Sequence, residues 1–174
     1  MSHLFRCCVA ALAATGALLC TGVAAAAPTS TTFAVVGYEY AFTSTEGFFA
    51  GAAVGNAGET GAWNTNVVHD PLGSSPTHVN GGSFQMATVG GGGALDTVTG
   101  TFVHHGGMIT TLDPGANCTN QRYRVTGSLQ DVATSTTSGG TGTFTVTLTH
   151  YRTSLFGHCI IYKAKVAGAV GFSY

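Results

Sequence analysis

The side chains of this chain that could do chemistry are histidines at the ends of expected β-strands. His104, His150 and His158 are each in phase with the apolar residues of an alternating pattern, so each is expected on an inward face. Converging imidazoles can bind zinc or copper, or exchange a proton near neutral pH. In an up-and-down sheet, His104 lies at one rim and the other two lie at the opposite rim. A site built from all three histidines is therefore not expected.

His150 and His158 flank a short turn, 153–157, and are the first candidates for a functional site. A hairpin that sets them opposite each other would place their Cβ atoms about 5 Å apart. Tyr162 follows in the same phase and could add a hydroxyl group. The pattern favours a structural role, in which the two histidines cap the core at the rim. An acid–base pair and a two-histidine metal site are the less favoured alternatives. It indicates no cofactor and no metal site.

Asp131 is a second candidate, because it is in phase with inward residues of its strand and is expected near His104. A carboxylate beside a histidine can orient it as a general base. A strand-end aspartate that turns toward a loop is the favoured alternative. Binding of a ligand is expected to involve inward aromatic side chains, and the candidates are Phe102, Tyr123, Phe144 and Tyr162. The chain lacks the nucleophile-elbow, phosphate-loop, HExxH and CxxC motifs.

Alternation of apolar and polar residues positions these side chains. In Gly142–His150, phenylalanine, valine and leucine occupy one face and threonines the other. Strands are expected near 32–42, 48–54, 62–68, 83–89, 96–104, 107–112, 121–132, 141–152 and 158–172. No sustained helical spacing occurs. The expected fold is all-β, a small antiparallel barrel of eight or nine strands in meander order, with a β-sandwich as the alternative.

Three glycines support the barrel. Gly100, Gly127 and Gly168 lie in V-[TA]-G-x-apolar segments, in phase with the inward face. A glycine inside a strand weakens it and often marks a bend, so three equivalent ones favour a sheet that closes. One common interior is expected, and its members are Val98, Phe102, Tyr123, Val125, Leu129, Phe144, Val146, Leu148, Ile160, Tyr162, Val166 and Val170.

The N-terminal segment has the layout of a secretory signal peptide. One arginine precedes an uncharged apolar run, 7–23, and alanines follow it. We expect cleavage after Ala26, which leaves a single β domain, 27–174, in a secreted or extracytoplasmic location; an uncleaved anchor is the alternative. No other run is long and apolar enough to span a membrane. Of the five cysteines, Cys118 and Cys159 remain after cleavage and are expected to form a disulfide.

Composition narrows the classes of function. Six Lys and Arg against seven Asp and Glu leave no basic excess, so a nucleic-acid partner is not expected. The leading hypothesis is a secreted, non-enzymatic barrel that binds a small apolar ligand or a surface partner. The alternatives are an isomerase- or cyclase-type enzyme that uses interior His, Tyr or Asp groups, and a structural protein of the cell envelope. A binder needs a cavity, an enzyme also needs two converging titratable groups, and a structural protein needs a filled core.

Overall fold

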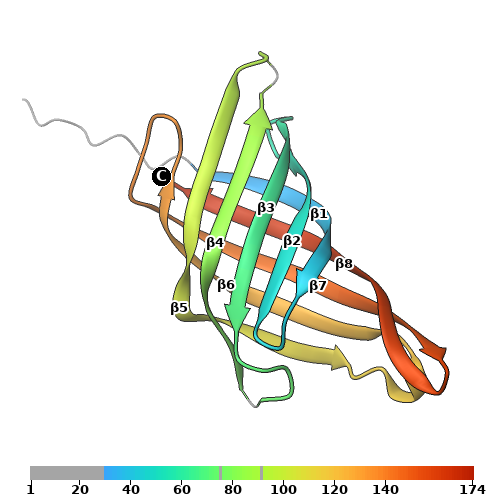
Figure 1. Cartoon of the computed structure of the whole chain (residues 1–174). Helices are drawn as coiled ribbons and strands as arrows, with labels where there is room; N and C mark the ends of the chain where they lie inside the picture. Colours follow the sequence, from blue (N-terminus) through green and yellow to red (C-terminus); the bar gives the residue numbers. More distant parts are fainter. Residues whose placement is uncertain (1–29, 75, 91) are drawn as a thin grey trace, which may run out of the picture.

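The computed structural model describes residues 30–74, 76–90 and 92–174, and the expected signal peptide lies outside them. The described chain forms one closed antiparallel barrel in meander order (Figure 1). Its elements are β1 (Ser30–Phe42), β2 (Glu46–Gly55), β3 (Thr60–His69), β4 (Thr77–Val89), β5 (Leu95–Asp113), the single-turn η1 (Ala116–Cys118), β6 (Gln121–Ala133), β7 (Gly140–Leu155) and β8 (His158–Ser173). No helix in these residues has the length and apolar character needed to cross a bilayer.

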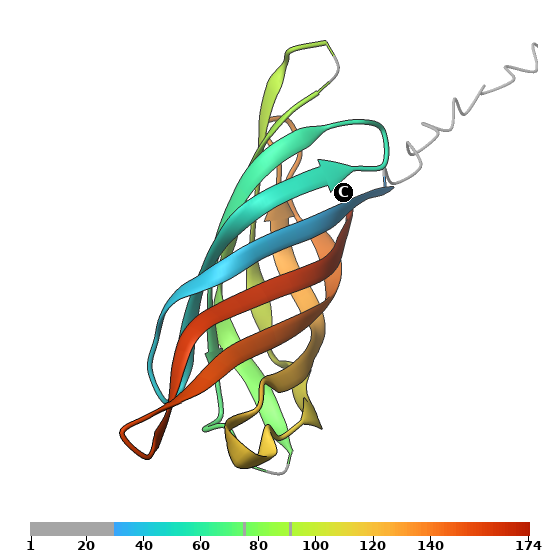
Figure 2. The same cartoon turned by 90° about the vertical axis from the view of Figure 1, so that its right-hand side faces the viewer.

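Pairing of the first strand with the last closes the barrel. β1 pairs with both β2 and β8, for example through Gly37 with Gly51 on one side and with Val166 on the other. The expected barrel is therefore confirmed over the sandwich. Figure 2 shows the strands tilted around the barrel axis, as closure of a sheet requires.

The structure has eight strands because two expected strands, 96–104 and 107–112, are one strand, β5. Phe102 pairs with Leu129 of β6, and Gly107 pairs with Gly127. An advance of five residues along β5 therefore corresponds to only two residues along β6. The residues between Phe102 and Gly107 bulge out of the ladder and do not form a turn. His105 within the bulge has a positive φ of 55°. The glycine-histidine composition of this stretch resembles a turn, and the sequence prediction failed there for that reason.

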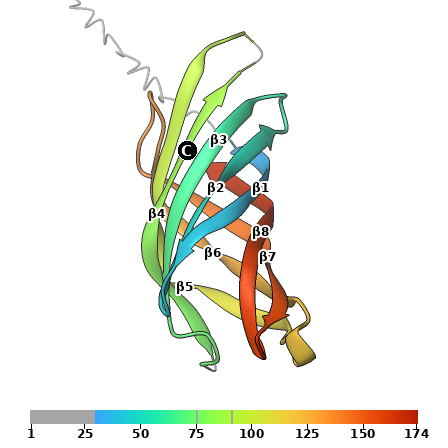
Figure 3. The same ribbon diagram turned by 45° about the vertical axis from the view of Figure 1, so that its right-hand side comes forward.

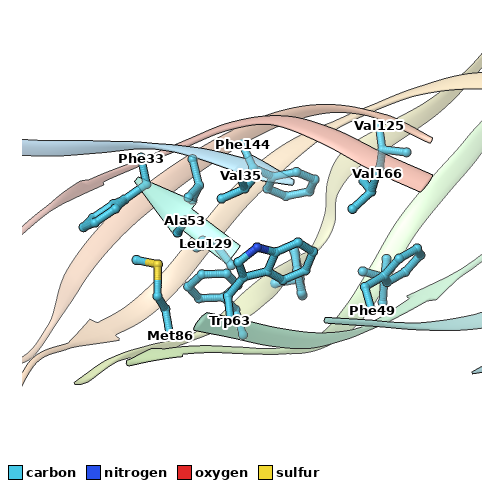
Figure 4. Packing of buried hydrophobic residues seen from close by; sticks show 14 of the residues in the cluster. Phe33, Val35, Phe49, Ala53, Trp63, Met86, Val125, Leu129, Phe144 and Val166 are labelled. Atoms are coloured by element: carbon cyan, nitrogen blue, oxygen red, sulfur yellow. The ribbon is translucent and has the colours of Figure 1, made fainter. Parts of the chain in front are cut away.

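The barrel interior is apolar and is filled mainly from alternate positions of every strand (Figure 4). Trp63 of β3 lies near its centre, 6% exposed, and its indole Nε1 donates a hydrogen bond to the Ala52 carbonyl at 2.9 Å. Gly37 makes room for it, since a Cβ at Gly37 would lie 2.7 Å from the indole Cζ2. At Gly168, a Cβ would collide with the Thr145 carbonyl oxygen of β7. These glycines permit close approach inside the barrel.

Ten of the twelve expected interior residues face inward, nine of them fully buried and Val146 half-buried against the core. Ile160 and Tyr162 were expected inside but are 38% and 62% exposed. Tyr151 pairs with Lys163, and Arg152 pairs with Ile161, so Tyr162 is an extra residue in β8. This bulge inverts the faces of the first part of β8, because a one-residue slip sends each side chain to the other face.

The expected disulfide is confirmed. Cys118, in η1, is bonded to Cys159 at the start of β8, with a Cα–Cα distance of 5.5 Å. It ties the β5–β6 connection to the β7–β8 hairpin at one end of the barrel (Figure 3).

Candidate functional site

The candidate site consists of two adjoining hollows, one at an end of the barrel and one in its interior. At this end, β1 turns into β2, β3 into β4, β5 into β6 and β7 into β8. The mouth has a volume of about 670 Å³ and is lined by residues of these connections, including Ser44, Gly73 and Pro114. A narrower apolar cavity of about 100 Å³ lies deeper. The two spaces adjoin, since five residues line both: Phe42, Thr43, Leu72, Tyr123 and His150.

A buried pair of titratable groups lies where the mouth meets the interior. His150 Nε2 is 2.9 Å from Glu39 Oε2, and the two side chains are each 5% exposed. β1 supplies the glutamate and β7 the histidine, both from inward positions. An isolated ionised group is costly to bury, so each group depends on the other. No other ion pair occurs within the described residues.

Aromatic rings shield the pair. The ring of Phe42 stacks on His150 at a centroid distance of 6.4 Å, and Tyr123 packs edge-on against it at 5.6 Å. Burial raises the pKa of the Tyr123 hydroxyl, and the nearby Glu39 carboxylate raises it further while Arg152 opposes this. The tyrosine therefore stays neutral over the physiological range and can donate a hydrogen bond.

The chemistry available here is proton exchange in a mainly apolar space. Glu39 can accept a hydrogen bond from Nε2 and so orient the His150 ring, as carboxylates do for general-base histidines. In the described part of the chain, Nδ1 of His150 has no hydrogen-bond partner, which leaves it open to a bound molecule. The described residues contain no group of three or more His, Cys, Asp or Glu arranged to hold a metal ion.

Phe102, Tyr123 and Phe144, three of the four aromatic candidates for ligand binding, line the inner cavity. Phe102 and Phe144 pack edge to face at 5.1 Å. The fourth candidate, Tyr162, lies outside the barrel because of the β8 bulge.

The expected pairing of His150 with His158 is wrong. His150 pairs with Ala164, and His158 pairs with Leu155 next to a two-residue turn. The turn is tighter than expected and the β8 bulge shifts the register, so His158 is exposed while His150 is 4% exposed. Of these two histidines, only His150 lines the interior site.

The expected inward placement of His104 and Asp131 is also wrong, because both lie in bulges. His104 is exposed on the outer surface, where its Nδ1 is 2.9 Å from the Asn80 carbonyl oxygen and its ring stacks on His105 at 4.0 Å. Asp131 is exposed with a φ of 53°, at the irregularity between Leu129 and Val132. Neither lines the cavity or the mouth.

Glu39 is the functional candidate that the sequence interpretation missed. It is in phase with Phe33, Val35 and Gly37 of β1, all of which are buried. A carboxylate at the end of such an inward series is a signal that alternation alone could have supplied. Its partner, 111 residues away, could not be identified without the closed sheet.

Comparison of the chain with protein-family models, with curated proteins and with solved structures finds no match. The functional argument therefore depends on the site itself.

Proposed function

We propose that this chain is a secreted barrel protein that binds a small, mostly apolar molecule with a polar end. The observation that carries the proposal is an apolar inner cavity that adjoins an open mouth, with the Glu39–His150 pair where the two meet. The apolar part would occupy the interior, and the polar end would contact the pair. A few polar groups in an apolar pocket are the usual means of orienting a ligand.

The volumes indicate the shape of the ligand. The inner cavity of about 100 Å³ is below the roughly 300 Å³ of a typical ligand site, whereas the mouth adds about 670 Å³. A slender apolar group therefore fits inside, and a larger part remains in the mouth against Phe42, Leu72 and Tyr123.

Two observations support an extracytoplasmic location. The N-terminal segment has the composition of a signal peptide. The disulfide between Cys118 and Cys159 is of the kind that persists in oxidising compartments.

Paired substitutions on β1 test the binding. Val35 lines the inner cavity, while Val36, the next residue, is 43% exposed on the outer face. We expect the fluorescent apolar probe N-phenyl-1-naphthylamine to bind the wild-type protein and the Val36→Phe variant equally, and to bind Val35→Phe at least tenfold more weakly. Thermal unfolding of each variant shows that it remains folded. Equal binding by both variants, or no binding by the wild-type protein, would contradict the proposal.

A second function, acid–base catalysis of the isomerase or cyclase type, is favoured by the 2.9 Å contact between Glu39 and His150. An orienting carboxylate, a histidine and a neutral tyrosine in an apolar site suit proton transfer at carbon. The probe reaction is exchange of the α-protons of 2-decanone for deuterium, followed by NMR. Deuterium exchange that is faster than in buffer, and that is lost in the His150→Gln variant, would support catalysis. If the protein does not raise the exchange rate, ligand binding is the only function that stays supported.

A further inference from the structure

The positive charges of this barrel are collected on one part of its wall. The described residues contain five Lys and Arg side chains, and these are Arg122, Arg124, Arg152, Lys163 and Lys165. All belong to β6, β7 or β8, in the halves of these strands nearest the mouth. The strand register places Arg122 and Lys165 at the same level of the sheet, because each pairs with Thr149 of β7, from opposite sides. Arg122, Arg124, Lys163 and Lys165 form a basic wall on the outside of the barrel. Arg152 is in phase with the inward residues Leu148 and His150 and donates a hydrogen bond to the Gly115 carbonyl, so it is not part of this wall.

The basic wall has few opposing charges. β7 and β8 contain no Asp or Glu, and the acid of β6, Asp131, lies toward its other end. Asp113 of β5, which pairs with Arg122, is the nearest acid in register, and its Oδ1 accepts a hydrogen bond from the Gly115 amide. None of the five cations forms an ion pair with a described residue. The chain is slightly acidic as a whole, so this segregation gives it one face that attracts anions.

An apolar tip projects beside the basic wall. The β7–β8 hairpin projects away from the other connections of this barrel end in Figures 1 and 2. Its turn residue Phe156 is 92% exposed, and Leu155 and Ile160 are 47% and 38% exposed. The Cys118–Cys159 disulfide ties the hairpin to η1. We call Leu155, Phe156 and Ile160 the hairpin tip.

Tyrosines lie between the hairpin tip and the cations. Tyr162 is 62% exposed, and its ring is 6.4 Å from that of Tyr151. The Lys163 ammonium lies 5.1 Å from the centre of the Tyr38 ring and 5.8 Å from that of Tyr151. This order of groups suits a bilayer surface. The exposed phenylalanine suits the acyl chains, the tyrosines suit the interfacial region, and the cations suit anionic headgroups.

We propose that the hairpin tip and the basic wall dock this protein on the surface of an anionic lipid bilayer. The tip enters the outer part of the bilayer, and the wall contacts the headgroups. An anionic polymer or an acidic protein would also satisfy the cations, but neither accounts for a fully exposed phenylalanine at the end of a tethered hairpin. Docking does not depend on ligand binding, although it would bring the mouth, which Ile161 of the same hairpin lines, close to the lipid.

Vesicle flotation tests the docking. The protein is expressed in a host that secretes it and is assayed in the secreted form. We expect binding to vesicles of phosphatidylcholine with phosphatidylglycerol and much weaker binding to phosphatidylcholine alone. Each cation near an anionic surface contributes roughly fivefold, so Lys163→Gln/Lys165→Gln should weaken binding roughly 25-fold. Phe156→Ser removes the ring that would enter the bilayer, and this loss should weaken vesicle binding roughly tenfold or more. Leu95→Ser is the matched control, because Leu95 is 69% exposed at the opposite end of the barrel.

A second measurement locates the tip. Trp63 is the single tryptophan of the chain and is buried, so a Phe156→Trp variant adds one new signal. Its emission should shift to the blue on anionic vesicles and be quenched by brominated lipid. Loss of binding in the lysine variant but not in Phe156→Ser would indicate a surface for anionic polymers and overturn the proposal. A dimer in vesicle-free solution that Phe156→Ser dissociates would assign the tip to a second copy and also overturn it. Probe binding to the cavity without vesicles is a separate readout, so failure of docking and failure of ligand binding can be distinguished.

Discussion

Glu39 and His150 face each other across the inside of the barrel, with Oε2 and Nε2 2.9 Å apart and both side chains 5% exposed. The two residues come from strands that do not pair with each other, since β8 lies between β1 and β7. Their contact therefore requires the curvature of the closed sheet. A buried polar contact of this kind, at the entrance to an apolar cavity, links the stability of the barrel to its proposed function.

Loss of both members of this pair should cost less than the two single losses added together. Glu39→Leu leaves the imidazole buried without its partner, and His150→Leu leaves the carboxylate in the same condition, so each single variant should lose about 3 kcal/mol. The double variant should lose less than the sum of the two. Chemical denaturation of all four proteins gives the coupling energy. Strictly additive losses would show that the contact contributes nothing to stability.

The disulfide between Cys118 and Cys159 should contribute strongly to stability. It closes a long loop, with a sequence separation of 41, which limits the unfolded chain. The Cys118→Ala/Cys159→Ala variant should lose up to about 4 kcal/mol of unfolding free energy. Dithiothreitol should lower the melting temperature of the wild-type protein to a similar extent and leave that of the variant unchanged. A reductant effect that persists in the variant would point to another cause.

Gly37 should not tolerate a side chain. A Cβ there would collide with the Ala50 carbonyl oxygen and approach the Trp63 indole. Gly37→Ala should therefore destabilise the barrel by about 1–3 kcal/mol, as overpacking does, and should alter the tryptophan fluorescence. Gly92→Ala is the control, since nothing lies within 4 Å of its added Cβ. Equal melting temperatures for the two variants would disagree with the packing described for Trp63.

Asp70 should make stability depend on pH in the acid range. The Asn80 side-chain amide and then the His78 backbone amide, each 2.8 Å from a carboxylate oxygen, hold the pKa of Asp70 below its ordinary value of 3.8. A lowered folded-state pKa stabilises the protein fully above the ordinary value, and this contribution is lost as the pH falls through the folded-state pKa. Asp70→Asn should therefore melt lower than the wild-type protein at neutral pH, and the difference should shrink toward pH 3. A difference independent of pH would exclude this role for the charge.

Alternation in the sequence was sufficient to predict the fold class and most of the core. Phe144, Val146 and Leu148 occupy every second position among threonines, and a strand with that pattern has only one face that it can bury. The cysteine pairing was also predictable, because only two cysteines of the sequence lie outside the expected signal peptide. These features follow from local geometry and simple counting.

The candidate site was less predictable, because bulges interrupt the alternation. One extra residue in β8 turned Tyr162 outward and removed His158 from the site, and the β5 bulge did the same to His104. A bulge depends on how two strands match across the sheet, so neither strand specifies it alone.

The sequence by itself determined that this chain forms antiparallel strands with one apolar face, joined by short turns and one disulfide. Only the tertiary structure decided which polar groups meet inside. Closure of the sheet brought Glu39 to His150, and the bulges excluded the other candidate histidines. The physical reason is that side-chain alternation is a property of each strand, whereas register and closure come from hydrogen bonds between strands distant in the sequence.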